Sequence, residues 1–125
     1  MTKKLAKQHY MSLTDIITQA WSGKTTRQYK QYKGLKKESL RDNMTNIELA
    51  LNILAEASTT EINKVQNPKG FKQRAEVARK GGKIAGDARK KLESQIGRSV
   101  ISRERASDYL PPADCIQELP EETED

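Results

Sequence analysis

The chain has 125 residues, of which 34% are hydrophobic and 32% are charged, and its formal net charge is +6 at pH 7. This length suits a single domain with a modest core. The lone cysteine, Cys115, excludes an intrachain disulfide, and no apolar run approaches the roughly 18 residues of a membrane span. Because the basic N-terminus also lacks the hydrophobic stretch of a signal peptide, we expect a cytoplasmic protein without a membrane partner.

The first third of the chain predicts short helices. Residues 1–11 are polar, and we expect them to be flexible. Apolar residues then recur at helical spacing from a weak capping pair, Ser12 and Asp15, until Gly23 stops the helix. Two more short helices are expected, one from a threonine cap at position 25 or 26 to Gly34, and a charged one over about residues 37–43.

The strongest helix pattern starts at Thr45. Thr45 and Glu48 form a T-x-x-E capping box, in which the hydroxyl and the carboxylate each accept a backbone proton at the helix start. Apolar residues follow at a period of 3.6 residues. The helix should end near Gln66, because Pro68 disfavours helical geometry at Asn67.

A further helical pattern covers residues 71–96, and the pair Gly81-Gly82 interrupts it. A glycine weakens a helix by about 1 kcal/mol relative to alanine. Two interpretations stay open: the glycines separate two helices, or one helix runs through and packs tightly there. Ala78, Gly82 and Gly86 lie four residues apart, and this seam of small residues favours close packing against another backbone.

The C-terminal part has little helical pattern. Residues 99–102 could form a short extended piece, and Ser102 is expected to cap a last turn through Ser107. Prolines at positions 111 and 112 end the ordered structure. Residues 114–125 contain six acids and no base, which predicts a disordered tail.

These patterns together predict an all-α fold. We expect a small bundle of about five helices around one long central helix, Thr45 to Gln66. The helical domain would span residues 12–110, between a flexible basic N-terminus (1–11) and a disordered acidic C-terminal tail (111–125). The expected core comprises Ile16, Ile17, Trp21, Leu40, Ile47, Leu51, Leu54, Ile62, Phe71, Ala78, Ile84, Ala88 and Leu92.

Basic residues cluster in two blocks on either side of the long helix. Residues 24–41 contain seven bases and one acid, and residues 69–91 contain nine bases and two acids, whereas residues 45–63 contain three acids and no base. Residues 1–113 alone have a net charge of +12. Such segregation indicates a basic surface that binds a polyanion, above all DNA or RNA.

Lysine and arginine neutralise phosphates, and tyrosines can stack on exposed bases. The candidate nucleic-acid-binding residues of the two blocks are Arg27, Tyr29, Lys30, Tyr32, Lys33, Lys36, Lys37, Arg41, Lys72, Arg74, Arg79, Lys80, Lys83, Arg89, Lys90 and Lys91. The alternative is that these cations form solvated helix faces and that both tyrosines belong to the core. The presence of two blocks favours non-specific contact with backbone phosphates.

Nothing in the sequence indicates catalysis, a metal site or a cofactor. His9 is the only histidine and lies in a polar stretch, and Cys115 lacks a base partner for nucleophilic work. The acids of the long helix, Glu48, Glu56 and Glu61, are expected on its solvated side or as partners of the basic blocks, not as a nuclease cluster.

The glycine-rich run 81–86 fails the phosphate-loop pattern, because Ile84 stands where serine or threonine is required. A weaker hypothesis is that a helix restarting near Gly82 presents free N–H groups to a phosphate, with Lys80 and Lys83 beside it.

Two strings in the chain are distinctive. The segment 25–62 contains K-G-L-K-K-E-S-L-R-D-N-M, and the segment 67–102 contains A-R-K-G-G-K-I-A-G-D-A-R. Both segments, about two thirds of the chain, resemble the C-terminal region of bacterial and phage proteins known as DNA-damage-inducible protein D and BRO-type antirepressors.

The resemblance implies a cytoplasmic, nucleic-acid-associated protein of the SOS response or of prophage regulation. The damage-inducible relative is associated with the recombinase filament on single-stranded DNA, and antirepressors bind DNA or a repressor. Such proteins usually carry an N-terminal DNA-binding domain of the BRO family, which this chain lacks. The resemblance therefore implies a detached C-terminal module, and it implies no catalytic residues.

We therefore expect a non-enzymatic regulatory module of the DNA-damage or prophage response that binds nucleic acid through backbone phosphates. The alternative is a protein-interaction or dimerisation module, in which the apolar helix and the small-residue seam form a homodimer or dock on a recombinase or repressor. If the protein binds nucleic acid, the acidic tail could fold over the basic surface and compete with it.

Overall fold

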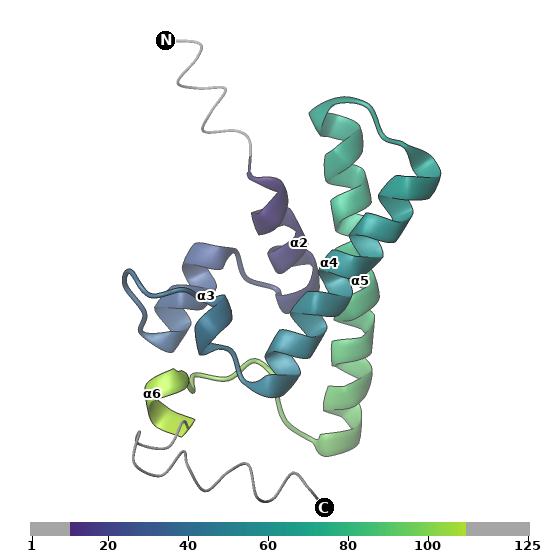
Figure 1. Cartoon of the computed structure of the whole chain (residues 1–125). Coiled ribbons are helices and arrows are strands. Elements are labelled where there is room, and N and C mark those ends of the chain that lie inside the picture. Colours follow the sequence, from purple (N-terminus) through teal and green to yellow (C-terminus); the bar gives the residue numbers. More distant parts are fainter. Residues whose placement is uncertain (1–10, 110–125) are drawn as a thin grey trace, which may run out of the picture.

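The computed structural model describes residues 11–109, and all regular secondary structure in that range is helical. The elements are α2 (Leu13–Ser22), α3 (Thr26–Lys33), the 3-10 turn η1 (Arg41–Asn43), α4 (Asn46–Gln66), α5 (Gly70–Ile96) and α6 (Ala106–Tyr109) (Figure 1). The all-α prediction of about five helices is confirmed. The predictions for the N-terminus, for His9 and Cys115, and for the acidic tail lie outside the described residues.

Three helices begin at the caps that the sequence predicts. Ser12 Oγ accepts the backbone N–H of Asp15 at 3.0 Å, and Gly23 ends α2 in the left-handed conformation. Thr25 and Thr45 each form a complete capping box with the residue three positions later. Such caps satisfy backbone groups that a helix end leaves without partners.

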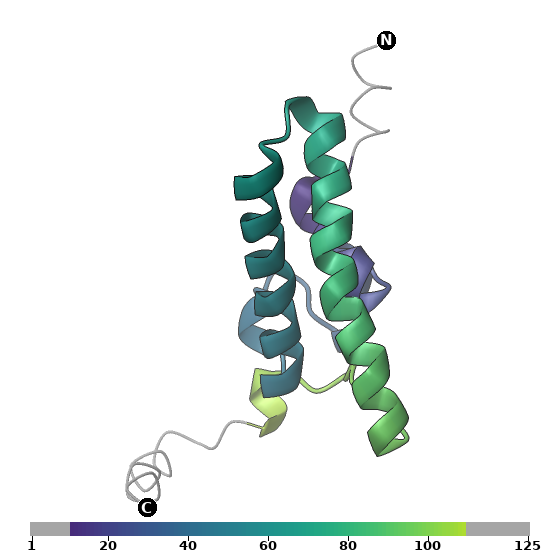
Figure 2. The same cartoon turned by 90° about the vertical axis from the view of Figure 1, so that its right-hand side faces the viewer.

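Helices α4 and α5 form a long antiparallel hairpin, and α2 packs against both (Figures 1 and 2). The chain reverses between them at Asn67 and Gly70, whose φ angles are 49° and 71°. The sequence predicts α4 as the central helix. However, α5 is longer, with 27 residues against 21, and it makes the main contacts with both α2 and α4.

Helix α5 runs without a break through Gly81 and Gly82, so the second of the two interpretations is correct. A Cβ atom added at Gly81 would lie 2.7 Å from the backbone N and Cα of Thr59 in α4. Added at Gly82 or Gly86, it would lie 2.8 Å from a backbone oxygen of α2. The glycines therefore let α5 approach two neighbouring helices at backbone contact distance.

The predicted core is confirmed in part. Ile16, Trp21, Leu40, Leu51 and Ala78 are buried. The remaining confirmed positions, half-buried or packed against the core, are Ile17, Ile62, Ala88 and Leu92.

Four positions of the predicted core are wrong: Ile47, Leu54, Phe71 and Ile84 are 38–46% exposed. On each long helix, the apolar part of the surface is wider than the part that neighbouring helices cover. The reason is that α2 packs against only one side of the hairpin (Figure 2). The core instead includes several residues outside the prediction, among them Tyr29, Leu35, Met44, Val100 and Ile101.

Two smaller predictions are also corrected. The charged helix over residues 37–43 is only the 3-10 turn η1. Ser102 does not cap the last turn, because its hydroxyl accepts the N–H of Glu104, and the carboxylate of Asp108 binds the N–H of Arg105 at the start of α6. Residues 99–102 form no strand in the described part of the chain.

Substitution Gly81→Ala should destabilise the protein by about 2 kcal/mol, because overpacking against the Thr59 backbone outweighs the better helix propensity of alanine. The free energy of unfolding, measured with urea, checks this. Ser94→Ala, at an exposed position of the same helix, serves as the control and should change stability little. A stabilised Gly81→Ala variant would contradict the close contact.

Candidate nucleic-acid interface

The two basic blocks lie on different sides of the molecule. The first block belongs to α3 and the loop after it, and the second belongs to α5. In Figure 1 these elements lie on opposite sides of α2 and α4. The candidate residues therefore do not form one common surface.

One row of cations runs along α5 beside α2. Lys72, Arg79, Lys83 and Lys90 follow one another in steps of seven and four residues, which places them on one side of the helix. All four are exposed. By helical spacing the row lies next to the strip that contains Gly82 and Gly86, which contact α2. We call these four residues the α2-side row.

A second row runs along the other edge of the exposed surface of α5. Lys80, Ile84 and Lys91 lie four and seven residues apart and are exposed. They border the strip that contains Gly81, which contacts Thr59 of α4. This α4-side row is mixed, because the exposed Ile84 lies between the two lysines.

Most of these cations have no carboxylate partner within the described residues. Lys72, Arg74, Arg79, Lys80, Lys90 and Lys91 form no ion pair there, and Arg74 is exposed in the first turns of α5. The Lys83 ammonium lies 3.3 Å from the carboxylate of Asp87, and both side chains are well exposed. Such a surface pair is weak and leaves Lys83 available to a phosphate.

Arg89, in contrast, has a structural role. Its Nε donates to the carbonyl oxygen of Trp21 at 2.7 Å, near the end of α2, and its Nη1 lies 3.0 Å from the carboxylate of Glu93. Glu93 also accepts the N–H of Val100 at 2.9 Å. Partial burial disfavours its charged form, but the hydrogen bonds from Val100, Arg89 and Ser99 hold the pKa of Glu93 below its usual value.

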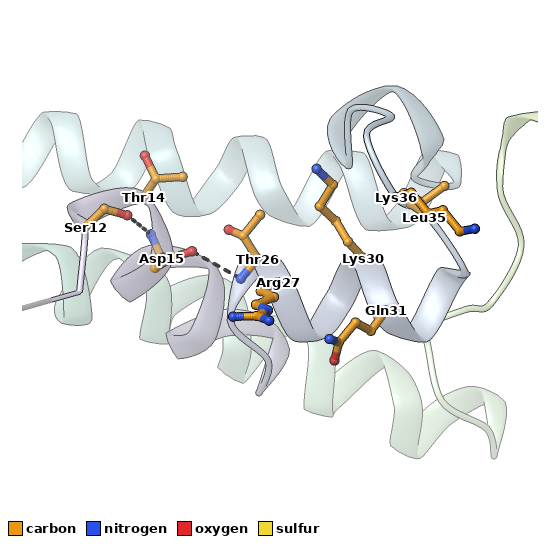
Figure 3. A pocket seen from close by; sticks show the side chains of 9 residues that line it. All are labelled: Ser12, Thr14, Asp15, Thr26, Arg27, Lys30, Gln31, Leu35 and Lys36. Carbon is orange, nitrogen blue, oxygen red and sulfur yellow. Dashed lines mark hydrogen bonds between the residues drawn. The ribbon is translucent and has the colours of Figure 1, made fainter. Parts of the chain in front are cut away.

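The first block is more dispersed. Arg27, Lys30 and Lys36 line an open groove of about 550 Å³ between α2 and α3, together with Asp15 (Figure 3). Figure 3 shows that the three side chains point in different directions, so they do not converge on one small anion. Asp15 Oδ1 already accepts the N–H of Thr26 at 3.2 Å.

The remaining cations on this side of the molecule differ in their surroundings. Lys37 is exposed without an ion pair among the described residues, whereas Arg41 binds Glu56 at 3.0 Å. Tyr32 is half-buried, and the Lys24 ammonium and the Arg103 guanidinium each lie over its ring, 4.5 Å from the centroid. These two cations already contact the ring that was expected to stack on bases.

Tyr29 and Lys33 must be removed from the candidate set. Both side chains are buried, and both bind Glu48, which is itself fully buried. The Lys33 ammonium lies 2.8 Å from Glu48 Oε1, and the Tyr29 hydroxyl donates to Glu48 Oε2. Glu48 therefore does not lie on a solvated face, but it is a partner of the first basic block, which is the other role that the sequence predicts for it.

This buried cluster joins three distant parts of the chain. Glu48 accepts the backbone N–H of Thr45 at 2.8 Å and that of Ser102 at 2.9 Å. Lys33 donates in turn to the carbonyl oxygens of Ser102 and Glu104. Burial and the hydrogen bond to Glu48 raise the pKa of Tyr29 well above its usual range, so its hydroxyl stays protonated.

Other candidate chemistries find no support in the described part of the chain. Because α5 is continuous, no helix restarts near Gly82, and the proposed phosphate site at a free helix end is corrected. Residues 11–109 bring together no group of three or more histidine, cysteine or acidic side chains able to hold a metal ion. Within the same range, no helix has the length and apolar character needed to cross a bilayer.

Comparison with known protein families, with curated proteins and with solved structures finds no match to this chain.

The buried cluster should make Glu48 one of the most sensitive positions of the protein. Glu48→Gln removes the charge that compensates the buried Lys33 and should destabilise the fold by about 3–5 kcal/mol, measured by urea unfolding. Adding Lys33→Met to Glu48→Gln should restore part of this loss. A loss within about 0.5 kcal/mol for Glu48→Gln, typical of a surface change, would contradict the assignment.

Glu93 should give the stability a defined pH dependence. Because its pKa is lowered by folding, the stabilisation that it provides is present above the unfolded value of about 4.3 and is lost as the pH falls through the folded value. Glu93→Gln should therefore lower the urea midpoint at pH 7 but have little effect near pH 2. Glu76→Gln, at an exposed site on the same helix, should have little effect at either pH. Equal losses for Glu93→Gln at both pH values would contradict this role.

Proposed function

We propose that this protein is a non-enzymatic module that binds nucleic acid through backbone phosphates, using the α2-side row of α5. The observation that carries the proposal is the row itself. Lys72, Arg79 and Lys90 are exposed and have no ion pair within the described residues, and Lys83 has only a solvated one. Phosphate contacts need unpaired cations of this kind.

The length of the row suits an extended polyanion rather than a small ligand. Lys72 and Lys90 are 18 residues apart, which corresponds to about 27 Å along an α-helix. One turn of duplex DNA spans about 34 Å. The groove between α2 and α3 is not lined by α5, and the two tyrosines of the first block are buried or already in contact with cations. We therefore propose binding without sequence reading.

The biological setting is a separate proposal. A role in the SOS response or in prophage regulation rests on the resemblance of two sequence strings to DNA-damage-inducible protein D and the BRO-type antirepressors. Sequence-independent binding by a basic helix is compatible with a regulator that acts on DNA already occupied by a recombinase or a repressor.

A second candidate function is protein interaction, and the apolar outer face of the α4–α5 hairpin favours it. Ile47, Ile53, Leu54 and Val65 of α4 are exposed, as is Ile84 of α5. Exposed apolar patches on small proteins commonly mark interaction sites. This surface is distinct from the α2-side row, so one module can carry both functions.

Salt-dependent binding to DNA tests the first proposal. The triple variant Lys72→Gln, Arg79→Gln and Lys90→Gln should bind more weakly. The slope of log K against log salt should fall by about one for each phosphate that the variant no longer neutralises. Fluorescence anisotropy with single- and double-stranded oligonucleotides measures both quantities.

The matched control changes three cations of the first block: Arg27→Gln, Lys36→Gln and Lys37→Gln. It removes the same charge from the other side of the molecule. The slope of log K against log salt should therefore stay close to that of the unmodified protein. Equal losses in the two triple variants would indicate general electrostatic attraction and contradict a specific role for α5. Absence of binding by the unmodified protein at low salt would contradict the proposed function altogether.

A further inference from the structure

The outer face of the hairpin is an apolar surface that no described element covers. We define it by the exposed residues Ile47, Ile53, Leu54 and Val65 of α4 and by the α4-side row of α5. Along α4, positions 47, 50, 54 and 57 follow one another in steps of three and four residues, and Ala50 and Ala57 are exposed as well. Figure 2 shows the two helices side by side on this face, with α2 and α3 behind them.

Two lysines border this apolar surface. Lys80 and Lys91 lie on either side of Ile84 along α5, and neither forms an ion pair within the described residues. A complementary partner would therefore present a few apolar side chains flanked by several carboxylates.

The chain itself contains such a segment. Residues 113–125 have the sequence A-D-C-I-Q-E-L-P-E-E-T-E-D, with six acids and no base. Ile116 and Leu119 are three residues apart, and acids stand at positions 114, 118, 121 and 122. This is the pattern of apolar and acidic groups that the outer hairpin face would bind.

The chain length also permits the contact. Helix α6 lies at the end of the molecule where α4 begins and α5 ends, on the α3 side, so the segment after it would pass around the start of α4 (Figures 1 and 2). Ile116 and Leu119 are seven and ten residues beyond Tyr109. Extended chain covers about 3.3 Å per residue, which allows them a reach of about 23 and 33 Å. Leu54 lies about 12 Å along α4 from its start, and Ile84 lies about 18 Å along α5 from its end.

We propose that the chain's own segment 113–125 docks on the outer hairpin face, with Ile116 and Leu119 against Leu54 and Ile84 and with its carboxylates near Lys80 and Lys91. A second copy of the hairpin is the less suitable occupant, because a symmetric contact brings the lysines of both copies into one interface. The docking does not depend on nucleic-acid binding, since it uses the other edge of α5.

Paramagnetic relaxation tests the proposal in the full-length chain. Cys115 is the only cysteine, so a nitroxide attached to it labels the segment without further substitution. We expect the amide signals of residues near Leu54, Ile84 and Lys91 to broaden selectively. Signals of α3, which lies on the other side of α2 and α4 (Figure 1), should broaden much less.

Controls separate the possible occupants. One control is a dilute mixture of two chains, one with the nitroxide but without ¹⁵N and the other with ¹⁵N but without the nitroxide. We expect no broadening in this mixture, because the contact is within one chain. Broadening in that mixture would mean that the segment of a second copy binds, and it would overturn the proposal. Absent or uniform broadening in the labelled ¹⁵N chain would overturn it as well, as would broadening centred on α3.

Matched variants test the chemistry of the contact. Lys80→Gln with Lys91→Gln should reduce the broadening by about twofold or more, whereas Lys72→Gln with Lys90→Gln should leave it unchanged. Because the spin label itself lies beside Ile116, an unlabelled comparison is needed. Ile116→Asp with Leu119→Asp should shift the amide signals of Leu54 and Ile84 relative to the unmodified chain, and unchanged signals would overturn the proposal.

Discussion

Contact between helix backbones fixes the position of α5, and the exposed surfaces of the protein depend on that position. Gly81 lies against Thr59 of α4, while Gly82 and Gly86 lie against the backbone of α2. Because this side of α5 packs directly against α2 and α4, almost all of the lysines and arginines of the helix are exposed to solvent. A side chain at any of the three glycines would push the helices apart.

The cations of this protein divide into those that hold the fold together and those that remain available. Lys33 is buried with Glu48, and Arg89 connects the end of α2 to Glu93. If Lys33 turned outward, the buried carboxylate of Glu48 would lose its compensating charge, so Lys33 cannot turn outward at low cost. Net charge therefore overstates the surface that can contact phosphates, and the available cations are concentrated on α5.

Local signals in the sequence predict the helices well. Ser12, Thr25 and Thr45 act as caps, and Pro68 follows the end of α4, because these effects involve only neighbouring residues. The roles of Lys33 and Glu48 could not be predicted, since their partners come from residues 102–104, far along the chain. The T-x-x-E motif does identify Glu48 as a capping residue, but it gives no sign of the buried lysine. The exposed apolar face was missed because periodicity shows an apolar arc and not how much of it is covered.

The central claim is that nucleic acid contacts the α2-side row of α5. Titrating a short DNA oligonucleotide into the ¹⁵N-labelled protein, with amide shifts followed by NMR, tests it most directly. We predict that the largest shifts follow α5 near Lys72, Arg79 and Lys90 and disappear at high salt. Shifts confined to α3 and its loop, or no shifts at low salt, would contradict the account.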